Sequence, residues 1–137
     1  MPLDLQIVTP EGVCFSGAVD GVVLPGVEGD FGVLPGHERF LSPLRIGEVE
    51  IRSGGKAQWA AMSEGFVEVS DDRVSVMVDT CELAENIDVA RAERARERAQ
   101  RELESLQRQA AERRDFRVWE AALQRAIARI SAASKHF

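Results

Sequence analysis

The chain has 137 residues, of which 45% are hydrophobic, and its formal net charge is −6. This composition excludes a disordered chain, and the length suits one domain, or a small domain with an appendage. No apolar run approaches the roughly 18 residues of a membrane span, and the first residues show no leader pattern. We therefore expect neither a membrane-spanning segment nor a targeting signal.

Period-two alternation, which is typical of β-strands, runs through the first part of the chain. Leu3, Leu5 and Ile7 share one face of the first run. The segments "GEVEIRSGGKAQWAAM" and "FVEVSDDRVSVMVD" each contain two runs joined by a tight turn, which predicts two hairpins. The shorter runs "GVVLPG" and "FGVLPG" end in Pro-Gly turns. Eight to ten such strands predict an antiparallel sandwich or a flattened barrel.

From Asp88 onward the hydrophobic period changes to 3.6, with Asp88 as the predicted N-cap. A second helix begins near Asp115, which is its predicted cap. The two apolar seams are Ala92, Ala95, Ala99, Leu103, Leu106 and Ala110, and then Trp119, Leu123, Ala126, Ile130, Ala133 and Phe137. The predicted fold class is α+β, with an antiparallel β-sandwich of about ten strands at residues 1–86 and an antiparallel two-helix hairpin at 87–137.

The link between the helices, at about residues 107–114, contains no Gly and no Pro. One continuous helix over 88–134, roughly 70 Å long at 1.5 Å per residue, is therefore also compatible with the pattern. The first seam is mostly alanine, and burying one methyl contributes on the order of 0.8 kcal/mol, against roughly 1.5–3 kcal/mol for a leucine. Two interpretations stay open, an ordinary hairpin and an element with two conformations.

Charge is distributed unevenly between the two parts. Residues 1–87 contain 5 Lys and Arg against 15 Asp and Glu, whereas residues 88–137 contain 12 against 8. This asymmetry predicts two parts with different partners. Because carboxylates interrupt the basic residues and aromatic platforms are lacking, we expect no nucleic-acid binding.

Four arginines are predicted to share one face of the hairpin. At about 100° per residue, Arg91 and Arg98 lie to one side of the first seam, and Arg125 and Arg129 to the same side of the second. With the turn near residue 110, Arg91 is level with Arg129, and Arg98 with Arg125. Guanidinium groups suit phosphate oxygens, so the patch favours a polyphosphate ligand. The alternative is a solvated face whose arginines already pair with carboxylates such as Glu102.

Other signals for chemistry are weak. The histidines are His37, beside Glu38 in a turn, and the penultimate His136, and no nucleophile–base pair or Walker-type loop accompanies them. We therefore expect a chain without a catalytic site. Cys14 and Cys81 form no CxxC motif, so a metal site is not indicated and a reducing compartment is expected. The sequence leaves open whether the two thiols meet.

Three segments carry a resemblance to a known family. They are "VEGDFGVLPGHERFLSPLRIGEVEI", "SEGFVEVSDDRVSVMVDT" and "ENIDVARAERARERAQRELE". In colinear order they resemble the epsilon subunit of bacterial F-type ATP synthases. The resemblance implies a non-catalytic subunit of the rotating central stalk of a proton-translocating enzyme, peripheral to the cytoplasmic face of the bacterial plasma membrane. Its implied partners are the gamma subunit and the c-ring, and the alpha and beta subunits for the helices.

The resemblance also implies contact sites. The positions that match the family's contact with the c-ring are Glu28, Gly29, Asp30 and His37. The family's helices inhibit ATP hydrolysis when they extend into the catalytic head, where basic side chains meet an acidic segment. The implied candidates for that contact are Arg113, Arg114, Arg117, Arg125 and Arg129.

Some bacterial members bind ATP on the folded hairpin through a motif of the form I/L-D-x-x-R-A. The motif is complete here, at Ile87, Asp88, Arg91 and Ala92. The accompanying family positions fall on Glu82, Arg98, Arg125 and Arg129. The resemblance thus implies ATP as a regulatory ligand and no required cofactor. A free-standing nucleotide-sensing protein of the same fold is the alternative, and a small hydrolase is disfavoured by the missing catalytic residues.

Overall fold

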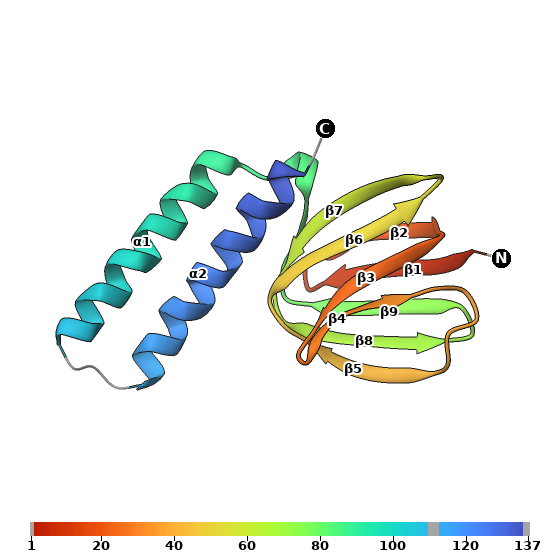
Figure 1. Cartoon of the computed structure of the whole chain (residues 1–137), viewed down its shortest axis with the longest axis horizontal. Helices are drawn as coiled ribbons and strands as arrows, with labels where there is room; N and C mark the ends of the chain where they lie inside the picture. Colours follow the sequence, from red (N-terminus) through yellow and green to blue (C-terminus); the bar gives the residue numbers. More distant parts are fainter. Residues whose placement is uncertain (1, 110–112, 136–137) are drawn as a thin grey trace.

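A computed structural model describes residues 2–109 and 113–135, which form a β-sandwich followed by two antiparallel helices (Figure 1). The strands are β1 (Leu3–Thr9), β2 (Gly12–Val19), β3 (Gly21–Gly26), β4 (Gly29–Val33), β5 (Phe40–Leu44), β6 (Gly47–Ser53), β7 (Lys56–Met62), β8 (Gly65–Ser70), β9 (Arg73–Val78) and β10 (Cys81–Leu83). The 3₁₀ turn η1 (Ala84–Asn86) leads to helices α1 (Val89–Arg108) and α2 (Arg113–Ser134). The predicted fold class is confirmed.

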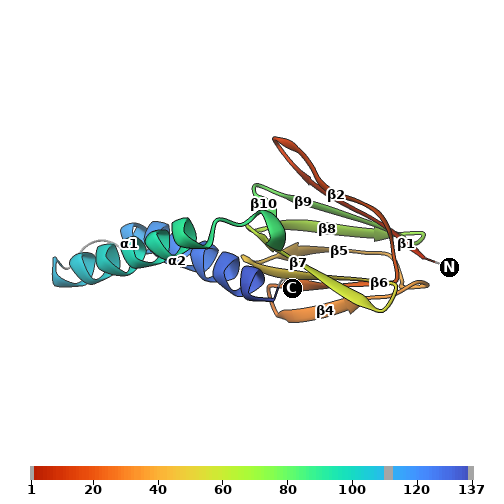
Figure 2. The ribbon, with the colours of Figure 1, turned by 90° about the horizontal axis from the view of Figure 1, so that it is seen from above.

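The strands form one hydrogen-bonded sheet in the order β10-β7-β6-β3-β5-β8-β9-β1-β2, with β4 paired to β3. Figure 2 shows this sheet folded into two layers, with β4 and β6 on one side and β2 and β9 on the other. The pairing of β1 with β9 is parallel, which differs from the predicted antiparallel arrangement. A parallel pair needs a long crossover rather than a hairpin, and the segment from β2 to β8 provides one. The terminal strands of this order, β10 and β2, come into contact, so the sandwich is nearly closed as a barrel.

The alternating side chains make the core of the sandwich as predicted. Leu3, Leu5 and Ile7 on β1 are buried, and so are the alternating valines of β8 and β9. Both predicted hairpins are present. Gly54 and Gly55 have φ values of 60° and 76°, which suits the tight turn between β6 and β7.

Gly65 gives a sharp test of the sandwich packing. A Cβ at this position would overlap the backbone carbonyl oxygen of Met77 and lie 2.7 Å from Cγ1 of Val78. Because the obstacle is the backbone of the paired strand β9, it cannot rotate away, and Gly65→Ala is expected to destabilise the fold by about 3 kcal/mol. Thermal denaturation measures the loss, with Gly32→Ala as control because a Cβ there meets open space. Equal melting temperatures for the two variants would contradict this packing.

The helix ends agree with the predicted hairpin in most respects. The Asp88 carboxylate accepts a hydrogen bond from the backbone N–H of Arg91 at 3.0 Å, so Asp88 is the N-cap of α1. The prediction that Asp115 caps the second helix is wrong, because α2 begins at Arg113 and Asp115 lies inside its first turn. An acidic side chain in that turn complements the helix dipole without occupying the cap position. Neither helix is long and apolar enough to cross a membrane.

The interface between α1 and α2 is built from small residues. Ala92, Ala99 and Ala126 are buried, as the two seams predicted. Ala95 is exposed instead, because it faces a cavity rather than the partner helix. The remaining described seam residues are half-buried, and the seam positions 110 and 137 lie outside the described residues.

Helix α2 also packs on the sandwich, through a second face that the sequence did not predict. Ala128 and Ala132 are buried against Ala61 of β7 and against Ile87. At the end of α2, Nζ of Lys135 lies 2.7 Å from a carboxylate oxygen of Glu48 and 4.2 Å from the centre of the Trp59 ring. The sandwich has its own core, separate from this cluster, so the hairpin is an addition to a domain that is already closed.

Candidate functional site

A cavity of about 360 Å³ lies where β10, the η1 turn and both helices meet. Its size falls in the range of small-molecule sites, roughly 300–1,000 Å³. The side chains around it are Glu82, Asn86, Asp88, Arg91, Ala92, Ala95 and Arg129. Charged groups thus come from three elements, namely β10, the N-terminus of α1 and the C-terminal half of α2.

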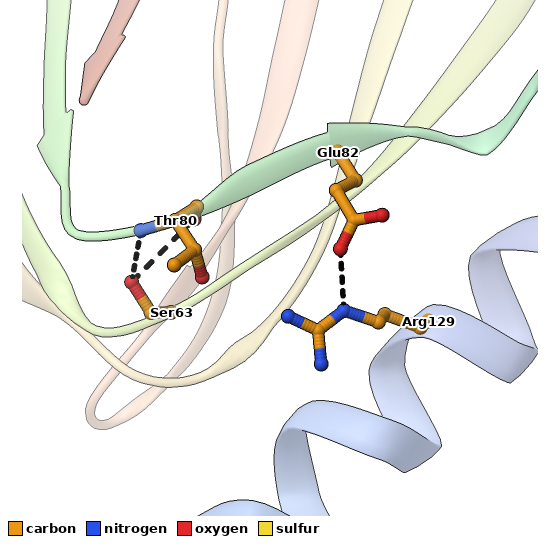
Figure 3. A network of polar contacts seen from close by, with 4 residues as sticks. All are labelled: Ser63, Thr80, Glu82 and Arg129. Carbon is orange, nitrogen blue, oxygen red and sulfur yellow. Dashed lines mark hydrogen bonds and ion pairs between the residues drawn. The ribbon is translucent and has the colours of Figure 1, made fainter. Parts of the chain in front are cut away.

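An ion pair joins the sandwich to the hairpin at this cavity. The Nε–H of Arg129 donates to a carboxylate oxygen of Glu82 at 2.6 Å, as Figure 3 shows. The two side chains are 27% and 39% exposed. An ion pair with this exposure contributes about 0–1 kcal/mol to stability. It therefore orients the Glu82 and Arg129 side chains but adds little to the attachment of the hairpin to the sandwich.

Glu82 is held in place by the hydrogen bonds that begin its strand. Thr80 donates its backbone N–H to Oγ of Ser63 at 2.8 Å (Figure 3). The backbone N–H of Ser63 in turn donates to the Thr80 carbonyl at 3.0 Å. Ser63 is buried. β10 then pairs with β7, with Glu82 opposite Ala61. The carboxylate therefore projects from a fixed strand into the cavity.

Arg91 is the more exposed of the two arginines that line the cavity. Its backbone N–H is satisfied by Asp88, while its side chain is exposed and has no ion-pair partner among residues 2–109 and 113–135. Two carboxylates, Glu82 and Asp88, balance the two guanidinium groups of Arg91 and Arg129. The cavity is therefore close to electroneutral, and the expectation that neighbouring carboxylates neutralise arginines holds for Arg129, through Glu82 rather than Glu102.

The structure brings together five of the eight predicted nucleotide-site residues. They are Glu82, Asp88, Arg91, Ala92 and Arg129. The predicted neighbours Arg91 and Arg129 do line one cavity. Asn86 and Ala95 were missed. The helical repeat could have predicted Ala95, because it lies one turn after Arg91 on the same face of α1. Asn86 lies before the helix, where no periodic pattern applies.

The other three predicted residues lie elsewhere. Ile87 belongs to the apolar cluster under α2. The Arg98 guanidinium carbon is 5.3 Å from the centre of the Trp119 ring, at cation–π distance. Arg125 is half-buried one turn before Arg129 and does not line the cavity. The predicted pairing of Arg98 with Arg125 stays a prediction.

The four positions matched to the c-ring contact are exposed but do not form one cluster. Glu28, Gly29 and Asp30 lie at the turn between β3 and β4, on the side of the sandwich nearer the helices (Figure 1). His37 follows the other end of β4, and the centre of its ring is 4.8 Å from that of Phe40. Asp30 is paired with Arg45 at 2.5 Å.

The five arginines matched to the inhibitory contact also fall into two groups. Arg113, Arg114 and Arg117 are exposed at the start of α2, at the end of the hairpin remote from the sandwich (Figure 1). Arg125 and Arg129 are half-buried in the second half of α2. In the folded hairpin the two groups have different surroundings, because Arg129 of the second group is paired with Glu82 of β10.

Comparison with known proteins identifies the chain's relatives. Two family models, described as the beta-sandwich and long alpha-helix domains of the "ATP synthase, Delta/Epsilon chain", match residues 2–84 and 85–134. The chain belongs to this family. Chains of this family are accessory subunits rather than catalytic ones, which agrees with the expectation from the sequence.

Individual relatives support the assignment over nearly the whole chain. The ATP synthase epsilon chain of Syntrophobacter fumaroxidans is 46% identical over 97% of this chain and 96% of its own length. That of Nitratidesulfovibrio vulgaris is 45% identical over 93% and 92%. A chain in the cryo-EM structure of the Euglena gracilis mitochondrial ATP synthase, OSCP/F1/c-ring in rotational state 1, has a TM-score of 0.79 at 25% identity. It covers 98% of this chain and 82% of the other. The resemblance to ATP synthase epsilon subunits is confirmed.

Proposed function

We propose that this chain is a rotor subunit of a proton-translocating F-type ATP synthase and couples the catalytic head to the c-ring. Its helical hairpin binds ATP when folded and inhibits ATP hydrolysis when extended. The subunit is peripheral, at the cytoplasmic face of a bacterial plasma membrane. Its bacterial relatives, named as ATP synthase epsilon chains, support this assignment.

The observation that carries the regulatory part is the origin of the cavity's charged groups. Glu82 comes from the sandwich, Arg91 from α1 and Arg129 from α2. A triphosphate that contacts both arginines therefore binds only while α1 and α2 lie side by side, as they do in the folded hairpin. A ligand that binds one conformation shifts the population toward it, so ATP favours the folded, non-inhibitory state.

The contact between hairpin and sandwich supports such a switch, because it is small. The buried alanines of α2 pack on Ala61 and Ile87, with Ile46 and Trp59 partly buried beside them. Each alanine methyl contributes about 0.8 kcal/mol, a large apolar side chain roughly 1.5–3 kcal/mol when fully buried, and each exposed ion pair about 0–1 kcal/mol. The total is of the same order as the differential ligand binding, roughly 5.5 kcal/mol, that moves a two-state equilibrium from 1:99 to 99:1.

Extension of the hairpin changes the partners of its arginines. Arg129 leaves Glu82, and its guanidinium becomes available to an acidic segment of the alpha and beta subunits. Arg113, Arg114 and Arg117 are exposed residues of the first turns of α2. We assign the inhibitory contact to Arg113, Arg114, Arg117, Arg125 and Arg129.

The sandwich offers surfaces for the other two partners. Pro43, Phe66, Met77 and Val8 lie side by side on four adjacent strands, and Phe66 and Met77 are 54% and 48% exposed. A continuous apolar row of this kind suits a protein interface, and we assign it to the gamma subunit. We assign the c-ring contact to Glu28, Gly29, Asp30 and His37, whose acidic side chains suit basic loops of the ring.

Truncation after residue 86 tests the proposed function in the assembled enzyme. The truncated chain keeps the whole sandwich core and the apolar row, so we expect it to remain in the purified ATP synthase. ATP hydrolysis by that enzyme is expected to rise, because the inhibitory helices are gone. Unchanged hydrolysis would refute inhibition. Absence of the full-length chain from the purified enzyme would instead favour a free-standing nucleotide sensor.

A further inference from the structure

Two free cysteines meet where the ends of the sheet come together. Cys14 lies on β2 and Cys81 on β10, and their Sγ atoms are 2.8 Å apart. These strands are the first and last in the sheet order and share no ladder of backbone hydrogen bonds. The two sulfurs are within about 1 Å of the bonded distance of 2.05 Å. The side-chain contact thus bridges the two ends of the sheet, β10 and β2.

The surroundings of the two thiols shift their pKa values in opposite directions, which gives them different roles in disulfide exchange. The hydrogen bond between the two thiols lowers the pKa of Cys14. That hydrogen bond, together with burial and the nearby charge on Glu82, raises the pKa of Cys81. Both side chains are half-buried at the edge of the core, so small oxidants reach them. Cys14 is accordingly the attacking thiolate, and Cys81 is the resolving thiol.

We propose that Cys14 and Cys81 form a redox modification site that closes the sheet with a reversible intrachain disulfide. The oxidant is a low-molecular-weight disulfide. The Cys14 thiolate attacks one of its sulfurs and releases one thiolate, which leaves a mixed disulfide on Cys14. Cys81 then loses its proton and attacks the Cys14 sulfur, releasing the second thiolate. Two protein thiols are oxidised and one small disulfide is reduced to two thiols.

The disulfide restrains the segment from which the helical hairpin departs. Cys81 is followed directly by Glu82 and then by the η1 turn that leads into α1. Tying β10 to β2 restrains the strand from which the helices depart and closes a long loop in the unfolded chain. We expect the oxidised form to melt about 5–10 °C higher than the reduced form. In a reducing compartment the pair stays as thiols, and the bond forms only under oxidative load.

The test uses the full-length chain, first reduced and then incubated with glutathione disulfide. Oxidation is expected to give a monomer about 2 Da lighter, with no alkylatable thiol, which dithiothreitol restores. Cys81→Ser removes the resolving thiol, so glutathione is expected to accumulate on Cys14. Cys14→Ser is expected to react at least 10-fold more slowly. Melting curves of both serine variants, and of Cys14→Ala, verify that each chain is folded.

Two results would overturn the proposal. They are two alkylatable thiols after oxidation of the wild type, and disulfide-linked dimers in place of the lighter monomer. Each readout is independent of ATP binding and of the assembled enzyme, so failure of the regulatory function leaves this test intact.

Discussion

Replacing Arg91 and Arg129 together by alanine is expected to weaken ATP binding by the isolated chain at least about 100-fold. Hydrogen bonds from a charged guanidinium to phosphate contribute about 1.5–3 kcal/mol each, and two of them account for a change of this size. The loss of Arg129 also leaves the Glu82 carboxylate without its partner, at a position that repels phosphate. Calorimetric titration with ATP measures the affinity directly.

The matched control is the double variant Arg94→Ala and Arg101→Ala. These arginines are exposed on α1 and do not line the cavity, so the same charge is removed from the hairpin without touching the site. The control is expected to bind ATP within about 3-fold of the wild type, a difference of less than 1 kcal/mol. Equal affinity of the cavity variant and its control would show that the cavity is not the nucleotide site. Unchanged melting of the sandwich excludes unfolding as the cause.

Introducing glutamate at Ala128 and Ala132 is expected to detach the hairpin from the sandwich. Both alanines are buried against β7 and Ile87, at exposures of 6% and 0%. An unpaired carboxylate forced into this contact costs at least about 3 kcal/mol, which shifts the equilibrium toward the detached state by more than about 100-fold. In the assembled enzyme the released hairpin reaches the catalytic head, so ATP hydrolysis is expected to fall.

Val118→Glu is the control for this second variant, because it places the same side chain on α2 at a position that is 64% exposed. Small-angle X-ray scattering of the isolated chain reports detachment as a longer maximum dimension, without labels. We expect the change for the double glutamate variant and none for the control. A compact double variant, or an enzyme whose hydrolysis rate is unaffected, would contradict the proposed role of the α2 contact.

Helical geometry predicted much of the site, because the position of a residue along a helix determines the direction in which its side chain leaves the helix. Arg91 and Arg129 were expected at the same height on the same face, and they line one cavity. The same reasoning did not anticipate the contact of Arg98 with Trp119. An arginine side chain is long and flexible, so the Cα–Cβ direction does not fix where its guanidinium lies. The guanidinium of Arg98 lies over the nearby Trp119 ring.

The helical pattern could not predict the pairing of Glu82 with Arg129, for a different reason. It depends on where β10 lies relative to α2, and the residues are 47 positions apart. The contact of Ala128 and Ala132 with the sandwich was missed likewise, since alanine is common on exposed helix faces and carries little hydrophobic signal.

By itself the sequence determined the two-part architecture, the strand faces of the core, the N-cap at Asp88 and the family. Each of these depends on residue type and local period, which act over a few neighbours along the chain. Only the tertiary structure decided that β1 pairs in parallel with β9, that α2 lies on β7, and that Cys14 meets Cys81 at the seam of the barrel. These contacts join segments distant in sequence, and their geometry follows from the packing of the whole sheet rather than from any local pattern.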